Sequence, residues 1–229
     1  RELLYLPFFG WGIALLDMIH IDRGRRADAF EQVVSQGTRK LAEGRRVIGW
    51  KIGLTSRAMQ QQLNITTPDS GVLLDDMAFA SGATIPAGRF IAPRIEAEIA
   101  FVMKAPLAGE VTRDQVLAAT DHVTPALEIL DTRIVRAEGD KTRTIIDTIS
   151  DNAANAGIVM GKARHDPAMN LRWVGAIVKR DGVVEETGLG AGVLDDPITG
   201  IIWLARRMGQ YGQRIEPGQI ILSGSFIRA

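Results

Sequence analysis

The chain has 229 residues, 46% of them hydrophobic and 24% charged, which is enough apolar material for one large globular domain with a sizeable core. Its 27 Lys and Arg residues balance 27 Asp and Glu residues, and this zero net charge argues against nucleic acid or an anionic membrane as a partner. The absence of cysteine excludes disulfides, zinc–thiolate sites and a cysteine nucleophile, and it fits a cytoplasmic protein.

Residues 1–44 are expected to form a helical and apolar N-terminal segment. The apolar run at 3–16, LLYLPFFGWGIALL, is shorter than the roughly 20 apolar residues that a membrane-spanning helix needs, and it contains Pro7. We interpret it as a buried segment or a subunit contact, with a signal-peptide-like region as the alternative. Apolar residues at helical spacing then predict a helix over 28–42 that ends near Gly44.

Residues 45–229 are expected to form the main domain, whose first half predicts short strands and short helices. The glycine-punctuated run VIGWKIGL is typical of a buried strand, and Thr55 or Ser56 can cap a helix after it. The spacing of Thr112 and Gln115 matches a capping box. The predicted strands are 47–54, 71–79, 94–101 and 124–134, and the predicted helices are 56–63 and 113–121.

The second half adds three strand regions and one helix. The pair Asp181-Gly182 predicts a hairpin turn, and Asp196 followed by Pro197 marks the start of a helix. Because strands outnumber helices and include a hairpin, the pattern favours an α+β fold over a doubly wound sheet. The predicted strand regions are 155–161, 173–188 and 218–226, and the helix is 197–208.

Three glutamates stand in unusually apolar strands. In RIEAEIAF, Glu96 and Glu98 share one face of a strand about 6.6 Å apart along the chain, and Glu128 lies among apolar residues in PALEILD. Partly buried anions need a compensating charge, and three carboxylates from two strands would suit Mg²⁺. The pattern leaves three alternatives open: a metal site, a solvated acidic face, or a catalytic acid/base pair.

Lys51 is the second exception, because GWKIG places it between apolar neighbours. It would be either one half of a buried salt bridge or a lysine that moves protons near a metal. Asp75 and Asp76 end an apolar run, and one of them could be its polar partner. The GLGAG run at 188–192 lacks the spacing of a dinucleotide-binding loop.

Several longer blocks together resemble one enzyme family, the hydratase/decarboxylase branch of the fumarylacetoacetate hydrolase superfamily, which acts in the meta-cleavage breakdown of aromatic compounds. The resemblance covers roughly residues 40–226 in consistent order. It implies a mixed β-roll with surrounding helices, an α+β fold that usually forms oligomers, with 45–229 as the catalytic domain. The blocks are KIGLTSRAMQ, PDSGVLLDDM, RFIAPRIEAEIAFVM, PALEILDTRI, DTISDNAANAGIVMG and GQIILSGSF.

The resemblance also implies roles for individual residues. Mg²⁺ or Mn²⁺ would be held by Glu96, Glu98 and Glu128, and the 1-carboxylate and 2-oxo oxygen of the substrate would complete its coordination. Lys51 would move protons, with Asp75 or Asp76 orienting it or the water. The residues expected to line the substrate site are Ser150, Asn152 and Ser225, and Arg133 is the expected ligand of a distal carboxylate.

The blocks LLDDM, DTISDNAANAG and GSF most resemble those of hydratases that add water to a 2-oxo-enoic diacid of the 2-oxohept-4-ene-1,7-dioate type. A 4-oxalocrotonate-type decarboxylase and a C–C hydrolase are the alternatives. Family chains continue past the GSF turn, whereas this one stops at Ala229, so the C-terminal strands are expected to be missing. An inactive metal-binding oligomer subunit, including one paired with a sister decarboxylase, is therefore a further alternative to an active homo-oligomer.

Overall fold

The computed structural model describes residues 42–62, 66–133, 137–138, 141–142, 147–148 and 151–228. The apolar run at 3–16 and nearly all of the helix predicted over 28–42 therefore lie outside the described residues, so both stay predictions. Within the described part, no helix combines the length and apolar character that crossing a membrane requires.

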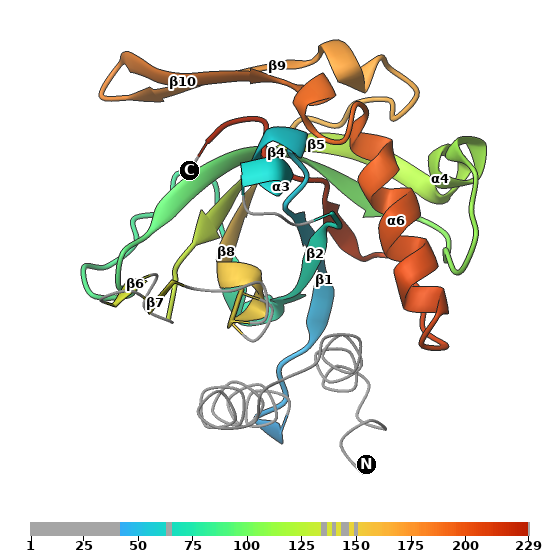
Figure 1. Ribbon diagram of the computed structural model, residues 1–229, viewed down its shortest axis with the longest axis horizontal. Helices are drawn as coiled ribbons and strands as arrows, with labels where there is room; N and C mark the ends of the chain where they lie inside the picture. Colours follow the sequence, from blue (N-terminus) through green and yellow to red (C-terminus); the bar gives the residue numbers. More distant parts are fainter. Residues whose placement is uncertain are drawn as a thin grey trace.

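A curled seven-stranded sheet forms the centre of the molecule (Figure 1). Its strand order is β2-β1-β11-β4-β5-β8-β3, with parallel pairs at β1/β11 and β3/β8 and antiparallel pairs elsewhere. This mixed, curled sheet with few helices confirms the predicted α+β class. The strands are β1 (Val47–Gly53), β2 (Asp69–Leu74), β3 (Ala78–Phe79), β4 (Arg94–Met103), β5 (Thr120–Leu130), β8 (Asn155–Met160) and β11 (Ile220–Leu222).

Two helices pack on the outer face of this sheet, at the right of Figure 1. Helix α4 (Arg113–Ala119) begins with the predicted capping box, in which Thr112 and Gln115 each bond the backbone N–H of the other. The Asp196 side chain caps α6 (Pro197–Gly209) by accepting from the Ile198 N–H. The shorter helices are α3 (Arg57–Gln62), η2 (Asp75–Met77), η3 (Asn152–Ala154), η4 (Leu171–Trp173) and η5 (Gly190–Gly192).

The predicted hairpin is confirmed as β9 (Gly175–Arg180) and β10 (Val183–Leu189), which lie above the main sheet in Figure 1. Asp181 and Gly182 both have positive φ, 51° and 82°, as a tight primed turn requires. The other two-stranded pair is β6 (Ala137–Glu138) with β7 (Lys141–Thr142).

Several predicted elements have different limits in the structure; the strand predicted over 124–134, for example, is β5, Thr120–Leu130. The strand predicted over 71–79 is interrupted: β2 ends at Leu74, the Asp75 N–H still bonds the Arg46 carbonyl next to the start of β1, and η2 then separates β2 from β3. The helix predicted over 113–121 ends at Ala119, since Thr120 already belongs to β5. The last predicted strand is reduced to β11, because the chain turns at Gly224 with φ of 122°.

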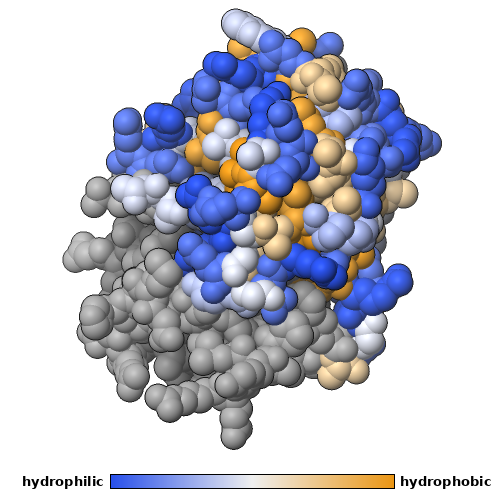
Figure 2. Space-filling model, turned by 90° about the vertical axis from the view of Figure 1, so that its right-hand side faces the viewer, coloured by the Kyte–Doolittle hydropathy of each residue, from blue (hydrophilic) through white to orange (hydrophobic). Residues whose placement is uncertain are grey.

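The two faces of the sheet carry different cores. The outer face packs with α4 and α6 in the larger apolar cluster, in which Phe101, Ile201 and Ile215 are fully buried. Figure 2 shows this side of the molecule, where polar residues dominate and apolar ones appear between them. The inner face has only a small apolar cluster, made of Leu73, Ala100, Ala126, Ile158 and Leu222. The inner face is therefore where polar groups have room.

Candidate metal centre and active site

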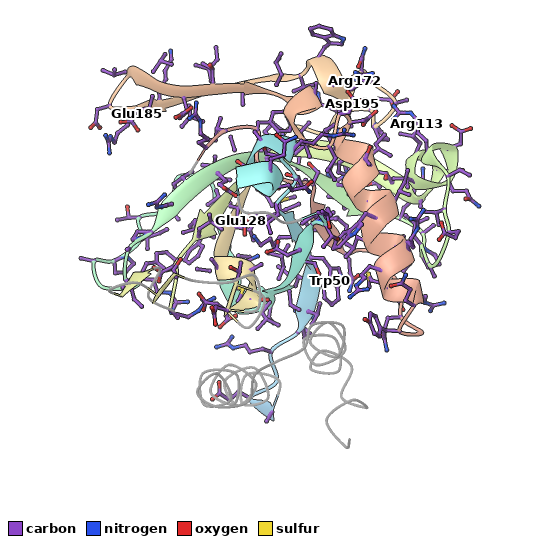
Figure 3. All side chains as sticks on the ribbon, in the orientation of Figure 1. Trp50, Arg113, Glu128, Arg172, Glu185 and Asp195 are labelled. Atoms are coloured by element: carbon purple, nitrogen blue, oxygen red, sulfur yellow. The ribbon has the colours of Figure 1, made fainter. Side chains whose placement is uncertain are left out.

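The register of β4 against β5 brings the three glutamates together on the inner face. Glu96 lies directly opposite Glu128, and Glu98 lies one step along, opposite Ala126. Each glutamate offers one oxygen within 4.8 Å of the others. Glu128 lies near the centre of the curled sheet (Figure 3) and is fully buried, while Glu98 is 5% exposed. The solvated acidic face that the pattern left open is therefore wrong.

Burial makes this acidic cluster electrostatically costly. Burial raises the pKa of Glu98 well above its usual value of 4.5, and repulsion from Glu128 and Glu96 raises it further. The Gly224 N–H opposes the shift by donating to Glu98 Oε2 at 2.8 Å. Burial also raises the pKa of Glu128, against the influence of Lys51.

The carboxylate oxygens of the cluster are suited to a metal ligand set. Glu98 Oε1 and both oxygens of Glu128 are buried and accept no hydrogen bond of good geometry from the described residues. Buried oxygens in this state need either protons or a cation. A convergent set of hard carboxylate donors fits a divalent cation such as Mg²⁺.

Lys51 is the positive charge that the chain itself places beside these acids. Its side chain extends from the middle of β1, the residue is 4% exposed, and Nζ lies 3.4 Å from Glu128 Oε1. Burial lowers the pKa of Lys51, but Glu128, Asp69 and the two remaining glutamates together raise it above its usual value. Lys51 thus rests as an ammonium ion within the acidic cluster.

Asp69 is a member of the site that the sequence patterns did not reveal. It is 3% exposed and lies on β2, opposite Gly53. A Cβ atom at Gly53 would come within 2.2 Å of Asp69 Oδ1 and 3.1 Å of Lys51 Nζ, so only glycine leaves room for this pair. The available signal was the aspartate immediately before the strand run SGVLL, on the same strand face as Gly71 and Leu73.

Asp75 and Asp76 lie elsewhere, in η2 at the far end of β2. Asp75 Oδ2 is 3.5 Å from Arg46 Nε, and Asp76 Oδ2 is 4.0 Å from Arg45 Nε. The structure thus places Asp69, rather than either of these residues, beside Lys51, because β2 has already passed the site when it reaches η2.

Two of the expected substrate-lining residues use their side chains in hydrogen bonds to the protein backbone. The Asn152 amide accepts from the Val72 N–H at 2.7 Å and donates to the Val72 carbonyl at 3.0 Å, which ties η3 to β2. The Ser225 hydroxyl donates to the Ile227 carbonyl within the C-terminal turn. Ser150 lies outside the described residues.

Arg133, the expected ligand of a distal carboxylate, is engaged by the protein itself. Its Nε donates to Asp151 Oδ1 at 2.6 Å, and its Nη1 and Nη2 donate to the Asn155 carbonyl at 3.1 and 3.2 Å. Asp151 is fully buried, so this ion pair has a structural role at the start of β8.

Comparison with known proteins gives this arrangement a family. No protein-family model matches the chain. The 2-oxo-hept-4-ene-1,7-dioate hydratase of Escherichia coli is 52% identical over 193 residues, 82% of this chain and 72% of that protein. The chain belongs to the hydratase/decarboxylase branch of the fumarylacetoacetate hydrolase superfamily.

Other members of the branch are also similar to this chain, in sequence and in structure. The 2-keto-4-pentenoate hydratase of Paraburkholderia xenovorans is 42% identical, with 82% of this chain and 69% of that protein covered. A solved structure is similar as well, that of the 4-oxalocrotonate decarboxylase from Pseudomonas putida G7 complexed with magnesium and adipate. The match covers 99% of this chain and 88% of the decarboxylase chain, with a TM-score of 0.80 and 31% sequence identity. These relatives confirm the predicted family, fold and hydro-lyase class.

Proposed function

We propose that this protein is a Mg²⁺-dependent hydratase that adds water to a 2-oxo-enoic diacid of the 2-oxohept-4-ene-1,7-dioate type during the breakdown of aromatic compounds. The observation that carries the proposal is the buried cluster of Glu96, Glu98 and Glu128 beside Lys51, in a chain 52% identical to a hydratase of that diacid. Assembly into homo-oligomers and pairing with a sister decarboxylase stay predictions from the resemblance, and a cytoplasmic location stays a prediction from the absence of cysteine.

The three glutamates would hold the metal ion. A related decarboxylase has been solved with magnesium and, in a second structure, with calcium, which supports a hard divalent cation here. When bound, Mg²⁺ would act as a Lewis acid toward the 2-oxo group of the substrate. Manganese, the alternative expected from the resemblance, would be held by the same oxygen ligands.

Lys51 and Asp69 would handle protons. Lys51 carries a proton at Nζ, only 3.4 Å from Glu128 Oε1, and Asp69 on the neighbouring strand favours the charged form of this lysine. Neutralising the glutamates would weaken their hold on that proton, because their negative charge is what raises the pKa of Lys51. Lys51 would then exchange a proton with the substrate carbon chain or the attacking water.

A decarboxylase is the second candidate. It is favoured by the match to the solved 4-oxalocrotonate decarboxylase over 99% of this chain and by a Pseudomonas decarboxylase that is 37% identical. The cluster around Glu128 would serve both reactions, since each passes through a charge that develops on the 2-oxo oxygen. Residues farther along the substrate must therefore decide between them.

One assay separates these candidates. The purified chain is incubated with Mg²⁺ and the 2-hydroxydiene form of the seven-carbon diacid, and diene absorbance, CO₂ and product mass are followed together. We expect loss of the diene, a product heavier by one water, and no CO₂. Glu96→Gln and chelation by EDTA serve as controls and should abolish the reaction. Release of CO₂ would instead establish the decarboxylase, and no turnover would identify an inactive subunit.

A further inference from the structure

One buried amide in the interior of the roll has no hydrogen-bond partner among the described residues. Asn155, the first residue of β8, is fully buried, and neither its Nδ2 nor its Oδ1 is hydrogen-bonded. Leaving a buried amide unsatisfied costs free energy, so buried polar side chains are almost always bonded in folded proteins. The exception requires a reason.

The sheet register places this amide beside the glutamate cluster. Asn155 pairs with Leu130, and Leu130 follows Glu128 by two residues on the same face of β5. The side chain of Asn155 therefore lies on the inner face, about 6.6 Å along the strand direction from the row that contains Glu96 and Glu128. Glu98 lies on the other side of the row that contains Glu96 and Glu128. Asn155 therefore extends the site in the direction that leads away from Glu98.

The backbone of Asn155 is held firmly while its amide is left open. Arg133 donates twice to the Asn155 carbonyl and is fixed in turn by the buried carboxylate of Asp151. Asn152, three residues earlier, shows the opposite arrangement, because both ends of its amide bond the backbone of Val72. The Asn152 amide therefore stabilises the fold through hydrogen bonds to the backbone, whereas the Asn155 amide does not.

We propose that the Asn155 amide binds an oxygen of the substrate chain beyond its 2-oxo acid end, the distal carboxylate of a diacid. This inference rests on the proposed function, in which the 2-oxo acid end lies at the three glutamates. Asn155 Nδ2 offers two donors to a carboxylate, and a neutral amide adds no charge beside Lys51. Asn155 thereby takes the task that the sequence suggested for Arg133, and Arg133 becomes its positioning residue.

The test compares two ligands on the Mg²⁺-loaded protein by calorimetric titration. The first is 2-oxoheptanedioate, which has the distal carboxylate but no double bond to hydrate, and the second is pyruvate, which lacks the distal part. In Asn155→Leu we expect 2-oxoheptanedioate to bind about 10-fold more weakly or worse, and pyruvate and Mg²⁺ to bind as in the wild type. The melting temperature should stay or rise, because the leucine removes an unsatisfied amide.

Asn152→Leu is the matched control, and it should lower the melting temperature because two backbone hydrogen bonds are lost. Equal weakening of both ligands in Asn155→Leu, or no weakening, would overturn the proposal. If the bulkier leucine disturbs the fold, Asn155→Ala must still discriminate between the ligands, and destabilisation in both variants would show a purely structural role. If the wild type binds neither acid, the proposed function fails, and this inference fails with it.

Discussion

At the scale of single residues, the site holds like charges close together, because the carboxylates of Glu96, Glu98 and Glu128 converge. Glu98 and Glu128 are almost completely removed from water, and the only balancing charge among the described side chains within contact distance of Glu128 is Lys51. Lys51 and a bound metal ion would therefore compete for the same carboxylate. The competition links the acid–base residue to the metal ligands.

Replacing Lys51 should separate these two roles. In Lys51→Met we expect kcat to fall by about 10²-fold or more, because the proton-transferring group is lost. Mg²⁺ should bind as tightly or more tightly, since a competing cation beside Glu128 has been removed. Steady-state kinetics and calorimetry measure the two effects.

Two variants provide the comparison. Glu128→Gln should weaken Mg²⁺ binding, whereas Lys104→Met, at an exposed position after β4, should leave both quantities unchanged. Weaker Mg²⁺ binding in Lys51→Met would contradict the competition between the lysine and the metal.

At the scale of elements, the turn after β11 connects the sheet to the metal ligands. Gly224 has a φ of 122°, which side chains rarely adopt, and its N–H holds Glu98 Oε2. A Cβ at this position would lie 2.2 Å from the hydroxyl oxygen of the buried Thr55. The glycine thus sets the geometry of a residue 126 positions away in the sequence.

Gly224→Ala should lower both stability and metal affinity. We expect a loss of about 2 kcal/mol in the free energy of unfolding, from backbone strain and the clash with Thr55, together with weaker Mg²⁺ binding. Urea unfolding and calorimetry are the measurements. Gly192→Ala is the control, because a Cβ there meets nothing within 4 Å, and its effect should stay within about 0.5 kcal/mol. Unchanged Mg²⁺ binding in Gly224→Ala would show that the turn does not position Glu98.

At the scale of the whole molecule, the curled sheet encloses the three glutamates on its inner face. The outer face of the sheet forms the larger apolar core. The inner face has only the smaller apolar cluster, because charged groups occupy part of it. The stability of the chain should therefore depend on the protonation of the inner face. A metal ion that binds only the folded state should restore the stability that ionisation of these carboxyl groups removes.

This dependence has a definite sign. The pKa of Glu98 is raised above 4.5 in the folded state, so that state binds more protons than the unfolded chain. In EDTA, the free energy of unfolding should therefore fall as pH rises from 4.5 through the folded pKa of Glu98. Urea titrations between about pH 5 and pH 8 measure the slope, and Glu98→Gln should flatten it. Saturating Mg²⁺ should raise the stability most at the higher pH. Identical slopes in the two proteins would rule out Glu98 as the cause.

The sequence by itself determined the features that depend on local signals. The alternation around Glu96 and Glu98 predicted a strand with two acids on one face, because side chains alternate along any strand. The capping box at Thr112 and the turn at Asp181 were recognisable for the same reason, since their residues contact neighbours only a few positions away. Longer blocks then identified the family and, with it, Glu128 and Lys51 as members of the same site.

Only the tertiary structure decided which polar residues meet at that site. Asp69 was missed, and Asp75 or Asp76 was expected in its place, because the pairing of β1 with β2, not the distance along the chain, fixes which aspartate faces Lys51. Arg133 was expected to bind a distal carboxylate, but its guanidinium donates to Asp151 and to the Asn155 carbonyl, because the fold brings the start of β8 next to the end of β5. Strand register and sheet curvature arise from contacts between distant segments, and no local pattern in the sequence contains them.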